Sequence, residues 1–130
     1  MGAPFSVPAG VTVATNGDVY VANPGSDAAG SGNILKVTAG VATEFVPGIN
    51  FGYPAGLALD VANLTLFVSG HDATGHDQVY AVTLSNKTVA TFNTGISQNT
   101  AGGGLHRART ADIYSWADFT ARPMGGFIIR

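Results

Sequence analysis

Two His-Asp pairs near the middle of the chain have side chains that could bind a divalent metal ion. His71-Asp72 and His76-Asp77 place two imidazoles and two carboxylates within seven residues. Imidazole nitrogens and carboxylate oxygens are ligands for zinc, and oxygens alone suit calcium. The spacing matches none of the well-defined zinc patterns. We therefore favour loop turns capped by the aspartates as the interpretation, with a calcium or zinc site as the alternative.

A histidine and an arginine stand together later in the chain, where a similar earlier segment has Ala58–Leu59. His106 has the side chain of a general acid or base near neutral pH, and Arg107 suits the binding of an anionic group. Titratable residues at apolar positions often mark functional sites. The alternative is that this pair lines a wet channel or pairs with Asp112 or Asp118.

Four further residues are candidates for contact with a small-molecule ligand. Asn23 and Asp27 belong to a loop of composition NPGSDAAGSGN and offer side-chain oxygens. Tyr53 and Trp116 could form an aromatic rim around a sugar or another flat ligand. Such aromatic side chains more often belong to the packing of the fold.

Composition limits the class of protein. The chain has 130 residues, which suits one domain over 1–130, with 45% hydrophobic and 11% charged residues. A net charge of −2 lacks the basic footprint of a nucleic-acid binder, and no apolar run approaches the ~20 residues of a membrane-spanning helix. There are no cysteines, so disulfides are excluded. The location stays open, and the weakly charged, Thr- and Asn-rich composition leans toward a secreted or periplasmic protein.

The candidate residues lie on a unit that occurs about three times, over residues 8–53, 54–100 and 101–130. Gly10 and Gly56 are 46 residues apart, and Gly56 and Gly104 are 48 apart. A period of 40–50 residues with four strands per unit is typical of propeller blades. The predicted strands are Gly10–Ala14, Asp18–Ala22, Ile34–Thr38, Val41–Val46, Gly56–Asp60, Leu64–Ser69, Gln78–Leu84, Thr88–Asn93, Gly104–Ala108, Asp112–Trp116 and Gly126–Arg130.

These predicted strands are apolar on both faces. In Leu64–Val68 and Val79–Val82, residues that point to either side are largely apolar, whereas a sheet with one wet face should alternate. Without helices, other sheets must cover both faces. The sequence thus predicts an all-β, propeller-like array of about three four-stranded antiparallel blades. A β-sandwich is the rival fold.

The motif Pro-x-Gly-[Leu/Val]-x-[Leu/Val], followed by Gly-Asp-Val-Tyr-Val-Ala-Asn, occurs within Pro8–Asn23. It resembles the NHL-repeat and gluconolactonase-like (regucalcin-like) propellers. Val41–Pro47 is similar to the outer strand of streptogramin lyases. The resemblance implies a propeller fold, usually of six or seven blades. Gluconolactonase-like enzymes carry metal-binding Asn or Glu near the start of innermost strands, where this chain has Ala9, Ala55 and Gly103.

About three blades are fewer than these families have, so two apolar sheet faces need a cover. The chain could be part of a longer propeller, or residues 3–7 could supply a closing outer strand. We favour a third solution, a homodimer that completes a six-bladed ring.

Two functions remain open at this stage. The favoured one is a ligand- or partner-binding scaffold that uses the loop rim, without catalysis. The alternative is a metal-assisted hydrolase or lyase of the gluconolactonase or streptogramin-lyase type, with His106 as acid/base and Arg107 as an electrostatic clamp.

Overall fold

A computed structural model of the chain describes residue 5 and residues 8–24, 32–49, 56–71, 77–92, 102–118 and 126–128. All regular elements in these parts are β-strands, so the all-β prediction is confirmed. The first four are β1 (Gly10–Val13), β2 (Val19–Asn23), β3 (Gly32–Thr38) and β4 (Val41–Ile49). The next four are β5 (Leu57–Leu59), β6 (Thr65–His71), β7 (Asp77–Thr83) and β8 (Val89–Phe92). The last three are β9 (Gly102–Arg107), β10 (Ile113–Asp118) and β11 (Gly126–Ile128).

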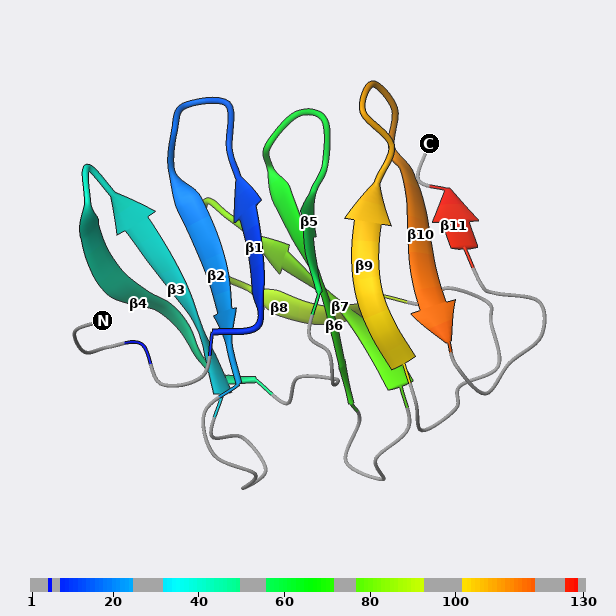
Figure 1. Cartoon of the computed structure of the whole chain (residues 1–130), viewed down its shortest axis with the longest axis horizontal. Helices are drawn as coiled ribbons and strands as arrows, with labels where there is room; N and C mark the ends of the chain where they lie inside the picture. Colours follow the sequence, from blue (N-terminus) through cyan, green and yellow to red (C-terminus); the bar gives the residue numbers. More distant parts are fainter. Residues whose placement is uncertain are drawn as a thin grey trace.

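The strands form three antiparallel sheets that follow the chain order (Figure 1). Sheet 1 has the order β1-β2-β3-β4, sheet 2 the order β5-β6-β7-β8, and sheet 3 the order β11-β10-β9. The first strand of each sheet adjoins the next, because β1 contacts β5 and β5 contacts β9. The first two predicted units thus each form a four-stranded antiparallel sheet. Three strands are described in the third, and the described residues form no closed ring.

Short turns connect the strands at one edge of the sheets, which we call the turn edge (top of Figure 1). Several turn residues have the left-handed backbone that such tight connections require. Gly17 has φ 90°, and the two central residues of the β3–β4 turn, Ala39 and Gly40, have φ 50° and 80°. Asn63 in the β5–β6 turn has φ 56°, which asparagine tolerates better than most residues. The Asn16-Gly17 dipeptide is typical of such tight turns.

Sheet 2 packs on sheet 1 through one of its faces. The register pairs Leu57 with Val68 and Leu59 with Leu66, and residues directly opposite each other share a face. All four side chains are buried, and Leu66 and Val68 have no exposed surface. They share one hydrophobic core with sheet 1 residues that include Tyr20, Ala22 and Ile34. Each fully buried aliphatic side chain of this kind contributes about 1.5–3 kcal/mol.

The opposite face of sheet 2 packs on sheet 3. A second core joins Ala58, Phe67 and Val79 of sheet 2 with Leu105 and Tyr114 of sheet 3. The Phe67 and Tyr114 rings meet edge-to-face, with centroids 4.8 Å apart. The prediction that other sheets cover both faces is therefore confirmed for the middle sheet.

Hydrogen bonds at the turn edge also connect the sheets. The Thr15 N–H donates to Oδ1 of Asn63 in the β5–β6 turn, over 2.7 Å. The Val61 N–H donates to Oδ1 of Asp112, which precedes β10, over 2.8 Å. We call these two contacts the turn bonds. In each, the later sheet supplies the side-chain acceptor and the earlier sheet the backbone donor.

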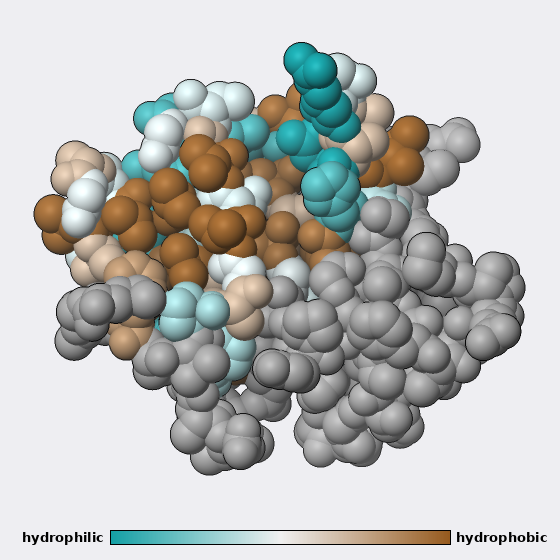
Figure 2. Space-filling model, in the orientation of Figure 1, coloured by the Kyte–Doolittle hydropathy of each residue, from teal (hydrophilic) through white to brown (hydrophobic). Residues whose placement is uncertain are grey.

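Sheet 1 has one face that is made largely of valines. Val11 and Val13 of β1 pair with Val21 and Val19 of β2, and Val19 pairs with Val37 of β3. We call these five residues the valine face. Val11 is 64% exposed and Val13 is 62% exposed, whereas Val21 is buried. Figure 2 shows apolar side chains gathered over this sheet.

Some strand bounds differ from the prediction. β4 runs from Val41 to Ile49 rather than to Val46, because register shifts against β3 let it continue through Pro47. β6 reaches His71 and β7 begins at Asp77, so the predicted 70–77 loop is shorter. Of the suggested closing strand over residues 3–7, only Phe5 is described. It is half-buried and lies outside any strand.

Candidate functional site at the polar edge

The edge opposite the turns gathers buried polar side chains, and we call it the polar edge. It is the edge where β1, β5 and β9 begin and where β2, β6 and β10 end. Asn23, Ser69 and Gln78 lie there and are 4%, 2% and 7% exposed. The other buried polar residue among those described, Asp18, lies toward the turn edge. Buried polar groups are retained where hydrogen bonds satisfy them.

A row of hydrogen bonds crosses three strands of sheet 1 near this edge. Asn23 Nδ2 donates to Asn33 Oδ1 over 2.8 Å. Asn33 Nδ2 in turn donates to Oε2 of Glu44 on β4 over 2.7 Å. We call Asn23, Asn33 and Glu44 the amide row. Asn23 and Asn33 are directly paired in the β2–β3 ladder, so strand pairing fixes their positions.

The amide row offers both kinds of hydrogen-bonding group to a ligand. Each side-chain amide has two N–H donors and a carbonyl acceptor, and a carboxylate accepts only. The row runs from buried Asn23 through half-buried Asn33 to exposed Glu44. Such a set can bind hydroxyl or amide groups of a neutral polar ligand. Of the sequence-predicted ligand residues, the structure places Asn23 in this row, and the sequence analysis missed Asn33 and Glu44.

Two other polar residues at this edge hold main-chain groups. Ser69 Oγ accepts the N–H of Gly56 over 2.7 Å, and the Ser69 N–H donates to the Gly56 carbonyl over 3.0 Å. This pair fixes the segment that leads into β5. Gln78 Nε2 donates to the carbonyl of Val79 over 3.3 Å. The polar side chains of sheet 2 at this edge therefore form hydrogen bonds to nearby main-chain groups.

The predicted metal residues fall partly outside the described part of the chain. The backbones of His71 and Asp77 are directly opposite each other in the β6–β7 ladder. Asp72 and His76 lie outside the described residues. Within the described residues, no group of three or more His, Cys, Asp or Glu side chains has an arrangement that could hold a metal ion. The calcium or zinc site stays a prediction.

The predicted catalytic pair occupies successive positions of β9, which point to opposite faces of the strand. Arg107 is half-buried, and its guanidinium donates to the Leu59 carbonyl of sheet 2 and, over 2.7 Å, to the carbonyl of Ala108. His106 is exposed and pairs with Ser115 of β10. Arg107 thus connects sheets 2 and 3 through main-chain acceptors. The structure does not bring the two side chains together on one face.

The remaining predicted ligand residues add little to the site. Asp27 and Tyr53 lie outside the described residues. Trp116 belongs to β10, where its backbone pairs with Leu105. The aromatic rim of Tyr53 and Trp116 and the oxygen contact from Asp27 stay predictions.

An ion pair that the sequence analysis missed lies toward the turn edge. Asp18 Oδ2 is 2.9 Å from Lys36 Nζ, and Asp18 Oδ1 accepts the Thr38 hydroxyl over 2.7 Å. The hydrogen bond from Lys36 lowers the pKa of Asp18, and the same bond raises the pKa of Lys36. Lys36 also lies 5.9 Å from the ring centroid of Tyr20. The alternation of Lys36 and Thr38 along β3, beside an aspartate that precedes β2, is the sequence signal for this cluster.

A second titratable group is fixed at the interface of sheets 2 and 3. The Tyr114 hydroxyl donates to Oδ1 of Asp112 over 3.1 Å. Burial raises the pKa of Tyr114 well above its usual range, and the bond to Asp112 adds to the rise. Asp112 also accepts the Val61 N–H. This carboxylate therefore organises the contact between the two sheets.

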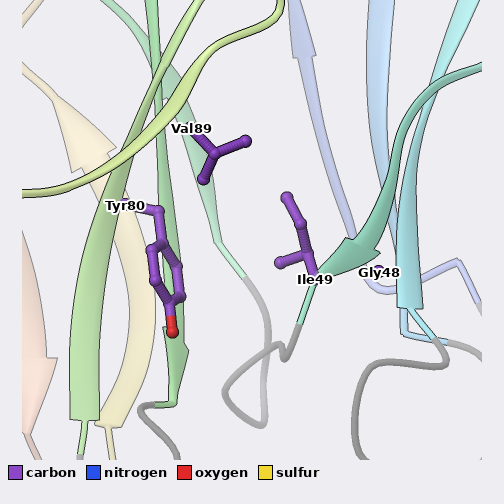
Figure 3. Close-up of a pocket in the computed structure, with 4 residues that line it drawn as sticks. All are labelled: Gly48, Ile49, Tyr80 and Val89. Atoms are coloured by element: carbon purple, nitrogen blue, oxygen red, sulfur yellow. The ribbon is translucent and has the colours of Figure 1, made fainter.

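A small pocket lies between β4 of sheet 1 and strands β7 and β8 of sheet 2 (Figure 3). Gly48 and Ile49 of β4, Tyr80 of β7 and Val89 of β8 line a space of about 110 Å³. Pockets for drug-sized ligands measure about 300–1,000 Å³. This pocket has room for a single small group only, so the amide row is the better candidate site.

Comparison with known proteins adds no family to this geometry. No protein-family model matches the chain, and no curated protein matches it either. In the described residues, we find no helix with the length and apolar character needed to cross a membrane.

Proposed function

We propose that this chain is a β-propeller-type repeat module that binds a neutral polar ligand, or a partner presenting such groups, through its polar edge. The three sheets would be blades of a propeller-like array of the NHL-repeat or gluconolactonase-like kind. The face-to-face packing of the sheets and the adjacency of β1, β5 and β9 support this arrangement.

The observation that carries the binding function is the amide row. Asn23, Asn33 and Glu44 are joined by bonds of 2.8 and 2.7 Å across three strands. Side chains held in this way lose little further freedom when a ligand binds, and such preorganisation favours affinity. The rigid ladder beneath them serves as the scaffold.

A titration followed by ¹⁵N NMR tests the proposal, because side-chain amides give their own signals. The probes are a panel of neutral mono- and disaccharides and short uncharged peptides. We expect at least one probe to shift the Asn23 and Asn33 side-chain signals in a saturable way. Asn33→Ala should weaken that binding about tenfold, the effect of one lost hydrogen bond of ~1.4 kcal/mol.

Asn86→Ala is the matched control, since Asn86 is an exposed asparagine of the β7–β8 turn, at the turn edge. It should leave the probe affinity unchanged. Saturable shifts confined to the turn edge, or none with any probe, would overturn the proposal. Elemental analysis tests the alternative function. A stoichiometric divalent ion that is lost in His71→Ala or His106→Ala would favour the metal-assisted hydrolase or lyase.

A further inference from the structure

We propose that the valine face of sheet 1 receives sheet 3 of a second copy of this chain, so that two copies form a closed dimer. The proposal concerns the partner of the sheet faces and does not depend on a ligand at the polar edge. The two can therefore fail separately.

The first argument is that equivalent positions are buried in one sheet and exposed in another. Val11 and Val13 in β1 correspond to Leu57 and Leu59 in β5, at an offset of 46 residues. Leu57 and Leu59 pack against sheet 1 and are 6% and 3% exposed. Val11 and Val13 are 64% and 62% exposed. The same strand positions that face the preceding sheet in sheet 2 thus lie open in sheet 1.

Sheet 3 repeats the pattern on the other side of sheet 2. Leu105 corresponds to Leu57 at an offset of 48 residues, and it packs against the preceding sheet with 6% exposure. Both internal interfaces are therefore built by one rule. The face of each sheet that contains these positions packs on the sheet before it. The valine face is the corresponding face of sheet 1, and among the described residues no preceding sheet packs on it.

The second argument comes from the turn bonds. Their donors are the N–H groups of Thr15 and Val61. Each donor lies two residues after the last residue of the first strand in its sheet, which is Val13 in β1 and Leu59 in β5. The corresponding residue of sheet 3 is Arg109, which is exposed. The acceptors come from the turn after the first strand of the following sheet.

In sheet 1 the corresponding turn carries Asn16, which is exposed. Its Oδ1 accepts the Asp18 N–H over 3.0 Å, and its Nδ2 donates to Asp18 Oδ2 over 3.1 Å. Sheet 3 therefore offers a donor position at Arg109, and sheet 1 offers an acceptor position at the second lone pair of Asn16 Oδ1. In one chain these positions belong to the first and third sheets. A second copy supplies each with its counterpart.

These arguments select a second copy as the occupant. One chain carries both the receiving face on sheet 1 and the opposite face of sheet 3, which presents His106 and the 47% exposed Ile113. Two copies satisfy both faces through two identical contacts related by a twofold axis, which is the commonest closed symmetry of oligomers. The contact continues the packing rule of the two internal interfaces.

The first test is the mass in solution by light scattering during size-exclusion chromatography. We expect twice the 13.2 kDa of one chain. Val13→Lys should convert the dimer to a monomer and keep the thermal unfolding cooperative, because Val13 is 62% exposed and the lysine does not enter a core. Val41→Lys is the control. Val41 is also a valine of sheet 1 and is 64% exposed, but it pairs with Thr38 beside the β3–β4 turn.

The second test uses the absence of cysteine from the sequence. The double variant Asn16→Cys with Arg109→Cys should give a disulfide-linked dimer on a non-reducing gel, and Asn86→Cys with Arg109→Cys should not. A monomeric wild type, a mass other than twice the chain, or a dimer that Val13→Lys leaves intact would overturn the proposal. So would a wild-type dimer whose Asn16→Cys, Arg109→Cys variant forms no covalent link.

Discussion

Asn63 combines a left-handed backbone with a hydrogen bond to a neighbouring sheet, and two substitutions separate these roles. Its φ is 56°, and its Oδ1 accepts the Thr15 N–H over 2.7 Å. Asn63→Gly removes the bond and relieves the backbone, whereas Asn63→Ala removes the bond and keeps a side chain at positive φ. We expect chemical denaturation to show a loss of about 1 kcal/mol for Asn63→Gly and about 2 kcal/mol for Asn63→Ala. Equal stability of the alanine variant and the wild type would contradict a structural role.

The Asp18–Lys36 pair makes stability depend on pH at both extremes. The pKa of Asp18 is lowered below its ordinary value of 3.8, first by the bond from Lys36 and then by the bond from Thr38. Its contribution is therefore complete above pH 3.8 and disappears as the pH falls through the folded-state pKa. The pKa of Lys36 is raised above 10.5, so its contribution is complete below pH 10.5 and disappears as the pH rises further.

Thermal unfolding midpoints between pH 2 and 11, measured for the wild type and Lys36→Met, check this expectation. The variant should lie below the wild type near pH 7 and approach it at the acid end, where Asp18 takes up a proton. Lys87→Met removes a lysine from the β7–β8 turn and should keep the acid limb of the wild type. A constant difference between Lys36→Met and the wild type at every pH would show that the loss arises from packing alone.

At the scale of elements, Leu64, just before β6, and Leu66, inside it, show how burial sets stability along one strand. Leu66 has no exposed surface and lies in the core between sheets 1 and 2, whereas Leu64 is 64% exposed. Leu66→Ala should cost about 2–5 kcal/mol of unfolding free energy, because it removes buried surface and leaves a cavity. Leu64→Ala should change stability by less than about 0.5 kcal/mol. Urea denaturation of both variants measures the difference, and similar losses would contradict the burial of Leu66 in the core between sheets 1 and 2.

The elements were largely predictable from the sequence because each strand is short, apolar and bounded by turn residues. Apolar residues on both faces of 64–68 predicted a strand covered from two sides, and sheet 2 has this environment. The end of β4 was not predictable in the same way. Proline usually interrupts a ladder, and β4 continues through Pro47 because register shifts against β3 accommodate it.

At the scale of the whole molecule, the repeat predicted three sheets but did not identify the amide row. Asn33 and Glu44 become neighbours of Asn23 only through the register of β2, β3 and β4, which a shift at Ile34/Leu35 modifies. The sequence pointed instead to His106 and Arg107 because their types are conspicuous. Their adjacency in a strand separates them onto two faces, and Arg107 bonds to a carbonyl of sheet 2. Register and pairing thus decide which polar residues meet.

The position of sheet 2 between the other two predicts an order of opening within the molecule. β6 is an inner strand of this sheet, and Leu66, Phe67 and Val68 are all buried. β8 is its edge strand, and Val89 there is 40% exposed. Amides of buried inner strands exchange only when the whole domain unfolds, whereas edge strands open locally at a lower free energy.

We therefore expect hydrogen exchange followed by NMR to give Leu66–Val68 amides an opening free energy equal to that of global unfolding. The amides of β8 that bond to β7 should exchange at least about tenfold faster, which is ~1.4 kcal/mol less protection. The Leu66→Ala variant provides the internal check. Its loss of global stability should speed exchange in β6 by the full amount and in β8 by much less. Equal protection of β6 and β8 in the wild type, or a larger effect of the variant on β8, would mean that sheet 2 is not the stable centre of the molecule.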